Sequence, residues 1–212
     1  MKSTQSTHIM KRLLPGIFSL LAIGLLAACG GNYNLSNMQA QTTALNITQS
    51  FTFPVVPASP AVQKCLPHAS GEATIIPDKL NDTLKFQVSG LAPKQKYTLF
   101  VTQTPNKPFG ISWYQGAIVT DDNGAGSVIA RGIFDAKTFS VSPGGTTTFA
   151  PTNQYHLGLW FSDPQTPFKL GCEPGANEPI VTPFNGAHNA GILALNTSNF
   201  PDNAGPLSKV QD

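Results

Sequence analysis

The sequence predicts an all-β fold in which two antiparallel sheets, with about eight strands in total, pack face to face. Its 212 residues include 19 glycines and 18 prolines, which separate short apolar runs, and only 11% of the residues are charged. Chains divided in this way are typical of β-sandwiches, and no segment shows a convincing amphipathic helical pattern. The length leaves room for one sizeable domain.

The predicted strands rest on the alternation of apolar and polar side chains. Residues 83–89 alternate strictly, with Leu84, Phe86 and Val88 on the side expected to face the core. Residues 97–101 repeat this pattern. Further strands are predicted at 73–76, 114–120, 127–134, 138–141, 155–161 and 191–195.

Turn residues and prolines define the borders of these strands. Asn123-Gly124 supplies the positive φ of a hairpin connection between two of them. Residues 51–56 are a candidate edge strand, because Pro54 and Pro57 interrupt a brief alternation. Long loops are expected in the C-terminal part of the chain.

The first 28 residues have the plan of a secretory signal. A polar start that carries Lys2, Lys11 and Arg12 precedes an apolar segment over 13–28. That segment is shorter than the roughly 20 apolar residues that a membrane span requires. Cleavage after an export signal is therefore expected rather than a spanning helix.

The end of this segment, Leu26-Ala27-Ala28-Cys29, resembles the lipobox of bacterial lipoproteins. In that family small residues precede a cysteine that is lipidated and becomes the new N-terminus. The resemblance implies a bacterial source, a lipoprotein signal peptide over 1–28, and attachment to a membrane through lipid on Cys29. The alternatives are an ordinary signal peptide with an incidental cysteine and a marginal membrane anchor.

Composition and charge bound the rest of the chain. Residues 29–50 are interpreted as a flexible tether, and 51–212 as a single β-sandwich domain. The domain would be extracytoplasmic, on the outer face of the cytoplasmic membrane or on an outer membrane if one is present. Three of the 13 Lys and Arg residues lie in the leader, so 10 remain against 11 Asp and Glu. This near-neutral balance, without a basic run, argues against nucleic acid as a partner.

Two cysteines remain once Cys29 is assigned to lipid. Cys65 and Cys172 are predicted to form a disulfide, because such bonds persist outside the cytoplasm. A metal site is the alternative, since His68 follows Cys65 at short spacing and Glu173 follows Cys172. A structural zinc site usually needs four N or S ligands, and no second pair of this kind occurs. No metal or other cofactor is predicted.

One motif points to a narrower fold class. Residues 89–101 contain a strand end, the turn Leu91-Ala92-Pro93 and a strand that bears Tyr97. This run resembles fibronectin type III and related immunoglobulin-like domains. The resemblance implies a two-sheet immunoglobulin-like sandwich in which Leu91 enters the core and the Tyr97 hydroxyl returns to the turn backbone as a tyrosine corner.

The same run also resembles copper/zinc superoxide dismutase-like sandwiches, in its Gly-Leu turn and its later acidic, glycine-containing turn. Those proteins carry His-x-His on the strand after the turn, where this chain has Leu99, Phe100 and Val101. The dismutase metal site is therefore not expected.

No motif predicts a catalytic residue, and the candidates for ligand contact are aromatic residues and one histidine. The aromatic candidates are Trp113, Tyr114 and Trp160, which lie near predicted loop ends and could serve a ligand or cap the core. His188 lies in a Gly/Asn-rich loop. The loop either lines a binding site or has this composition only because tight turns require it. His156 is interpreted as structural.

These observations predict a lipid-anchored extracytoplasmic module that binds a glycan, a cell-wall component or a protein, or that serves as an envelope component, without catalysis. The alternative is an extracytoplasmic hydrolase that uses His188 or carboxylates such as Asp163, Glu173 and Glu178 in the C-terminal loops. A third hypothesis, a small-molecule carrier, requires an enclosed apolar cavity.

Overall fold

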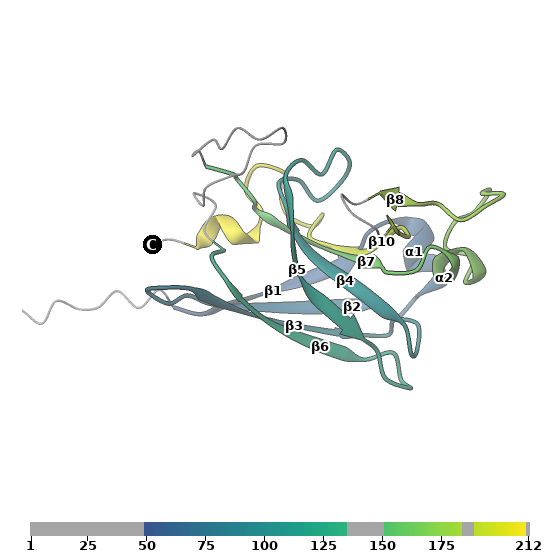
Figure 1. Ribbon diagram of the computed structural model, residues 1–212, viewed down its shortest axis with the longest axis horizontal. Helices are drawn as coiled ribbons and strands as arrows, with labels where there is room; N and C mark the ends of the chain where they lie inside the picture. Colours follow the sequence, from purple (N-terminus) through teal and green to yellow (C-terminus); the bar gives the residue numbers. More distant parts are fainter. Residues whose placement is uncertain (1–48, 135–150, 184–188, 211–212) are drawn as a thin grey trace, which may run out of the picture. The chain divides into compact units, whose positions relative to one another are not determined.

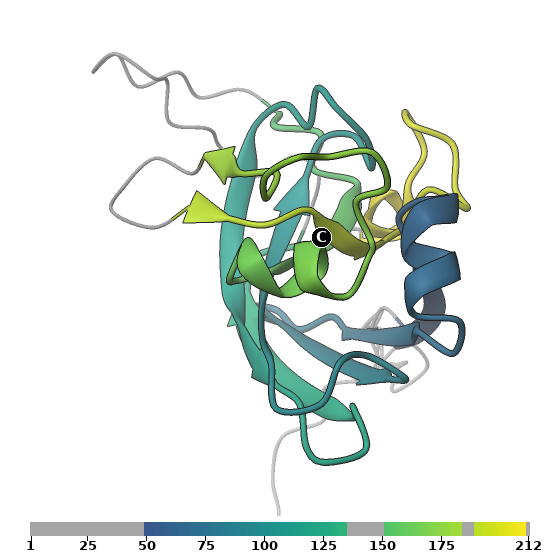
Figure 2. The same ribbon diagram turned by 90° about the vertical axis from the view of Figure 1, so that its right-hand side faces the viewer.

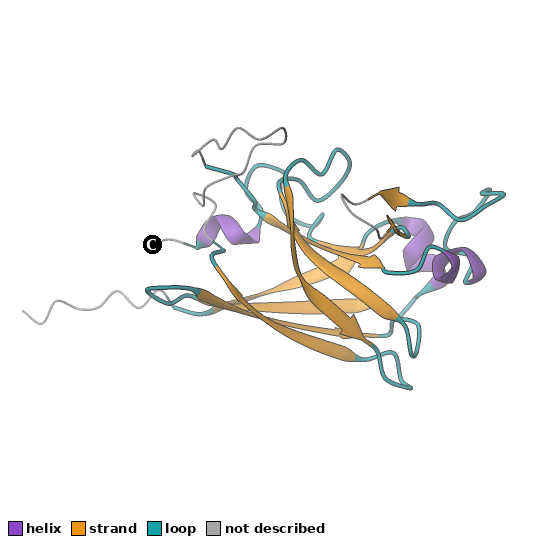
Figure 3. Cartoon of the chain, in the orientation of Figure 1, coloured by secondary structure: helices purple, strands orange, loops and turns teal. Residues whose placement is uncertain are grey.

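A computed structural model describes residues 49–134, 151–183 and 189–210 (Figure 1). The lipobox with Cys29, most of the tether, the predicted strand at 138–141 and His188 lie outside these ranges. Within them the chain is predominantly β, as Figure 3 shows, which confirms the predicted all-β class.

Eight strands form one antiparallel sheet. They are β1 (Phe51–Pro57), β2 (Ser70–Ile76), β3 (Asp82–Ser89), β4 (Lys96–Thr102), β5 (Ser112–Val119), β6 (Gly126–Gly132), β7 (His156–Phe161) and β10 (Leu193–Asn196). A second sheet pairs the two-residue strands β8 (Thr182–Pro183) and β9 (Asn189–Ala190). The short helices are α1 (Pro60–Cys65), α2 (Gln165–Lys169) and the 3-10 turn η2 (Pro206–Lys209).

The order in the large sheet is β5-β4-β7-β10-β1-β2-β3-β6. Its two halves face one another, with β4, β5 and β7 above β1, β2, β3 and β6 in Figure 1. One hydrophobic core draws on both halves, with buried side chains such as Ile75, Phe86, Leu99, Leu159 and Leu195. In the two clearest predicted strands, β3 and β4, the alternate positions expected to face inward all lie in this core: Leu84, Phe86, Val88, Tyr97, Leu99 and Val101.

Strand β1 joins the two halves, so its predicted place at a sheet edge is wrong. It pairs with β2 over 51–55 and with β10 at Val56 and Pro57. At Pro54 only the β2 side is paired, and the Pro54 carbonyl faces the other side, where it accepts from Asn199 Nδ2 at 3.5 Å. The N–H that proline lacks would also face that unpaired side, so its absence leaves no gap in the ladder. Because β1 pairs with β2 and with β10 through different residues, a strand that contains proline can lie in the middle of the sheet.

The turn before β4 has the geometry that the Leu91-Ala92-Pro93 motif predicts. The Ala92 N–H donates to the Tyr97 hydroxyl oxygen at 3.1 Å, and both residues are buried. Burial raises the pKa of Tyr97, although the hydrogen bond from Ala92 opposes the shift. Leu91 is also buried in the core. At the hairpin between β5 and β6, Gly124 takes a positive φ of 73°, and Asn123 does not share it.

Cys65 at the end of α1 and Cys172 beyond α2 form the predicted disulfide, at a sequence separation of 107. Figures 1 and 2 place the two helices at the same end of the large sheet. Among the described residues, no helix has the length and apolar character that crossing a bilayer requires.

Candidate ligand-binding pocket

A second, smaller hydrophobic cluster lies on the outer face of β4, β7 and β10. Successive strand residues face opposite sides, so Trp160 points outward while Leu159 and Phe161 belong to the main core. The Trp160 ring meets Phe100 and Phe109 edge to face, with ring centroids 5.5 and 5.0 Å away. Trp160 is therefore only 2% exposed.

Gly158 makes room for the Trp160 ring on the strand surface. A Cβ at this position would lie 2.5 Å from the ring, well inside van der Waals contact. The tryptophan can therefore lie flat along β7 only because the residue two positions earlier has no side chain. Ala190 from β9 packs against the same cluster.

The loop that carries Phe109 is held by amide side chains at its base. Gln103 donates from Nε2 to the Thr152 carbonyl at 2.7 Å and accepts from the Ile111 N–H at 2.8 Å. Asn196 of β10 donates from Nδ2 to the Pro105 carbonyl at 2.8 Å. Because these bonds use backbone groups, they fix the course of the loop over the sheet.

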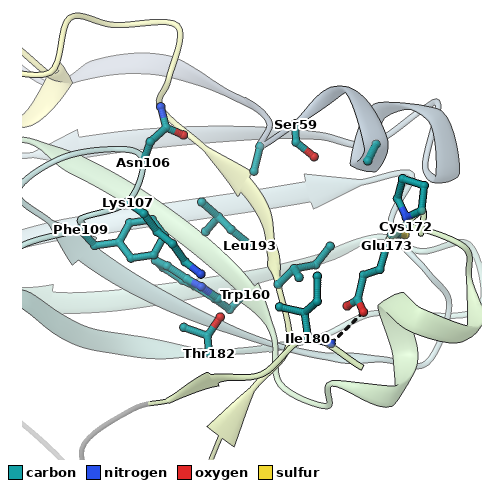
Figure 4. A pocket seen from close by; sticks show the side chains of 14 residues that line it. Ser59, Asn106, Lys107, Phe109, Trp160, Cys172, Glu173, Ile180, Thr182 and Leu193 are labelled. Atoms are coloured by element: carbon teal, nitrogen blue, oxygen red, sulfur yellow. Dashed lines mark hydrogen bonds between the residues drawn. The ribbon is translucent and has the colours of Figure 1, made fainter. Parts of the chain in front are cut away.

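A pocket of about 410 Å³ opens beside this cluster (Figure 4). We call it the Trp160 pocket. Its apolar wall consists mainly of Phe109, Trp160, Ile180, Ile192 and Leu193. Polar or charged side chains at its border are Ser59, Asn106, Lys107, Glu173 and Thr182. A volume of this size is in the range that small ligands occupy.

Glu173 is the one carboxylate among the described residues that line the pocket. The disulfide at Cys172 fixes its backbone, and the side chain is only 6% exposed. Its Oε2 accepts the Ile180 N–H at 2.8 Å. Its Oε1 has almost no solvent contact and no hydrogen-bond partner among the described residues. An unpaired buried acceptor of this kind costs about 1–3 kcal/mol, and more when it is charged.

Lys107 lines the same pocket without neutralising Glu173. The ion pair found among the described residues joins Lys94 and Asp122, at 2.7 Å on an exposed surface. Figure 4 shows the Lys107 ammonium and the Glu173 carboxylate on different sides of the pocket. The pocket therefore has a negative side and a positive side, separated by apolar side chains.

The structure distributes the predicted site residues unevenly. Trp160 forms part of the pocket wall, whereas Trp113 and Tyr114 are 57% and 54% exposed on β5 and do not line it. Tyr114 still reaches the outer cluster through an edge-to-face contact with Phe100, whose ring centroid is 5.8 Å away. The fourth candidate, His188, is outside the described residues.

The carboxylates of the hydrolase hypothesis do not meet in this pocket. Asp163 accepts hydrogen bonds from the Gln165 N–H and the Thr166 hydroxyl at the start of α2, and Glu178 is exposed. Within the described part of the chain, no group of three or more His, Cys, Asp and Glu side chains could hold a metal ion.

His156 is buried and makes structural contacts. Its Nε2 lies 3.0 Å from the Asp202 carbonyl, which can only accept, so this nitrogen carries the hydrogen. Its Nδ1 then accepts from the Thr197 hydroxyl at 2.8 Å. Burial lowers the pKa of His156, which keeps the ring neutral.

Sequence reasoning did not anticipate most of the pocket. Phe109, Lys107, Ile180 and Thr182 received no role, and Glu173 was considered only for acid pairs or metal. Its position directly after a disulfide cysteine was the one available signal. The chain matches no family model and no curated protein sequence.

Proposed function

We propose that this protein is a lipid-anchored extracytoplasmic binding protein that takes a small ligand into the Trp160 pocket. The observation that carries the binding proposal is the pocket itself, an apolar recess with one buried, incompletely bonded carboxylate. Small-molecule sites have this composition, with apolar walls and a few polar groups that fix the orientation of the ligand.

The cellular location has separate support. The resemblance of residues 26–29 to a lipobox supports attachment through lipid on Cys29, and the Cys65–Cys172 disulfide agrees with an oxidising compartment. The pocket would then face the periplasm or the exterior. The proposed ligands therefore include glycans, cell-wall fragments and peptides.

The absence of catalysis is proposed because the pocket has a single carboxylate among its described residues. Hydrolysis by paired carboxylates needs two such groups on opposite sides of the scissile bond. The buried His156 already uses both ring nitrogens in hydrogen bonds. No observation favours the hydrolase over the binding protein.

The finer fold class is proposed as an immunoglobulin-like sandwich in the broad sense. The tyrosine corner at Tyr97 and the two facing halves of the sheet support it. In immunoglobulin domains the fifth strand pairs with the second, whereas here β3 pairs with β2. The ladders pair β3 with β6 and β4 with β5, and the edge strands β5 and β6 are in contact without pairing, an arrangement similar to the Greek-key pattern that many sandwiches share.

A ligand screen on the lipidated protein in detergent tests the proposed function. The library contains small molecules, soluble glycans, cell-wall fragments and short peptides, and the readout is a ligand-induced rise in Tm. Binding should be lost in Ala61→Phe, which places a ring into the pocket from half-buried Ala61 of α1. The matched control Trp113→Ala, outside the pocket, should bind normally.

Each outcome of this screen has a defined meaning. A ligand lost in Trp113→Ala but kept in Ala61→Phe would move the site to the β5 surface and contradict the pocket. The absence of binding in every class would contradict the binding function. Chemical turnover of a bound ligand would favour the hydrolase.

A further inference from the structure

Glu173 has bonding capacity that the protein does not use. A carboxylate accepts hydrogen bonds through both oxygens, yet Oε2 alone is engaged, by the Ile180 N–H. The side chain is more than nine-tenths buried and the free oxygen has almost no solvent contact, so a donor that bonds to it has to displace the side chains that cover it. In Figure 4 this oxygen is turned toward the interior of the pocket.

We propose that the Trp160 pocket binds an organic amine, with the ligand ammonium at Glu173 Oε1 and its apolar body against Phe109 and Leu193. This inference rests on the proposed function, since it names the ligand class of the same pocket. An ammonium supplies both the missing donor and the missing positive charge. Hydrogen bonds in which both partners are charged are about twice as strong as neutral ones.

A divalent metal ion fits the same residues poorly. Calcium needs six to eight oxygen ligands, and magnesium needs near-octahedral geometry. The described residues around the pocket provide one carboxylate and no cluster of metal-ligating side chains. An ammonium can form a charge-assisted hydrogen bond with a single carboxylate oxygen and needs no coordination shell of several oxygen ligands, and the carbon chain of an amine suits the apolar wall.

Lys107 sets the orientation of the ligand. Its ammonium repels a second cation, so the amine end is directed toward Glu173 and away from Lys107. Neither residue has an ion pair in the described part of the chain, which leaves both charges available to the ligand. Loss of the Lys107 charge should therefore strengthen the binding of a simple monoamine.

The test compares two probes of nearly equal shape, 2-phenylethylamine and the neutral 2-phenylethanol. Titration calorimetry at pH 7.5 on the lipidated protein in detergent should give about tenfold tighter binding of the amine. In Glu173→Gln this preference should disappear. In Lys107→Met amine affinity should rise about twofold to threefold, because a nearby like charge is removed. The exposed carboxylate variant Glu178→Gln is the matched control and should retain the preference.

The comparison of probes on the unchanged protein needs no variant, so a folding defect in Glu173→Gln does not remove the test. Equal affinity for the amine and the alcohol would overturn the amine proposal. Competition between 2-phenylethylamine and added calcium would also overturn it, because it would indicate a metal site. Binding of other ligands that Ala61→Phe blocks, without binding of the amine, would overturn this inference and leave the proposed function standing.

Discussion

Two buried polar side chains, at the starts of β4 and β7, bond to neighbouring loops. The Tyr97 hydroxyl satisfies the backbone N–H of Ala92 in the turn before β4. His156 connects the start of β7 to Thr197 and Asp202 beyond β10. Each of these hydrogen bonds joins a strand to a loop segment whose backbone has no strand partner. The side chain therefore satisfies loop groups that strand pairing would otherwise satisfy.

Replacement of Tyr97 by phenylalanine should lower the free energy of unfolding by about 1–3 kcal/mol, because it leaves the Ala92 N–H buried without a partner. Urea denaturation followed by circular dichroism measures the change. The control Tyr114→Phe alters an exposed residue and should change stability by less than about 0.5 kcal/mol. Equal unfolding midpoints for Tyr97→Phe and the unchanged protein would contradict the role of this bond.

His156 should make the protein less stable in mild acid. Burial lowers its pKa below the ordinary 6.5, so the unfolded chain binds a proton at a pH where the folded protein does not. Its contribution is complete above pH 6.5 and is lost as the pH falls below that value, toward the lowered folded-state pKa. The loss is at most about 1.4 kcal/mol for each pH unit within that window.

Urea midpoints at pH 7.5, 6.5 and 5.5 test this dependence. His156→Asn should be less stable than the unchanged protein at pH 7.5 but should lose less stability between pH 6.5 and 5.5. The exposed residue His68 provides the control, and His68→Asn should keep the pH dependence of the unchanged protein. An identical pH dependence in His156→Asn would assign the effect to other groups.

At the scale of elements, the disulfide connects α1 to the segment that carries Glu173. Cys65 ends α1, and Cys172 follows α2, so the bond holds together two short helices that the sheet ladder does not reach. The same segment continues into β8, one strand of the small hairpin. The geometry of the Trp160 pocket therefore depends on this covalent link.

The double variant Cys65→Ala/Cys172→Ala should be destabilised by about 4–5 kcal/mol, because the bond closes a loop of 107 residues in the unfolded chain. Urea denaturation of the oxidised protein and of the variant measures the difference. Reduction of the unchanged protein with dithiothreitol should shift its midpoint to that of the variant. Midpoints that coincide before and after reduction would contradict a stabilising role.

The strands were predictable where the alternation of apolar and polar side chains alone identifies them. Alternation identified β3 and β4, because each buries one regular set of side chains in the core. β1 was misassigned to an edge, because its prolines are accommodated by an offset between two pairing partners that local sequence does not encode. The helices α1 and α2 are too short to show helical periodicity, so no amphipathic pattern marks them.

The pocket was not predictable, because its wall is assembled from segments that are distant in sequence. Phe109 comes from one loop, Trp160 from β7 and Glu173 from the segment after the disulfide. Aromatic candidates chosen by proximity to loop ends therefore divided between the pocket and the β5 surface. Strand pairing places Trp160, the amide hydrogen bonds place the Phe109 loop, and the disulfide places the segment with Glu173.

At the scale of the whole molecule, attachment decides which ligands the domain can meet. On the lipobox resemblance we propose Cys29 as the anchor. A stable anchor needs more than one acyl chain, since each buried methylene contributes only about 0.8 kcal/mol. A diacylglyceryl thioether provides two chains on one sulfur. It also removes Cys29 from thiol chemistry, which leaves Cys65 and Cys172 to pair with one another.

Cys29→Ser should abolish lipid attachment, because the thioether can form only on a thiol sulfur. In a bacterial host that processes lipoproteins, an alkyne fatty acid should label the unchanged protein and leave Cys29→Ser unlabelled and longer by the uncleaved leader. The double variant Cys65→Ala/Cys172→Ala retains Cys29 and should still be labelled, which separates lipidation from any general effect of cysteine loss. Labelling of Cys29→Ser, or cleavage of the unchanged protein at another residue without label, would contradict the anchor and return the leader to an ordinary signal peptide.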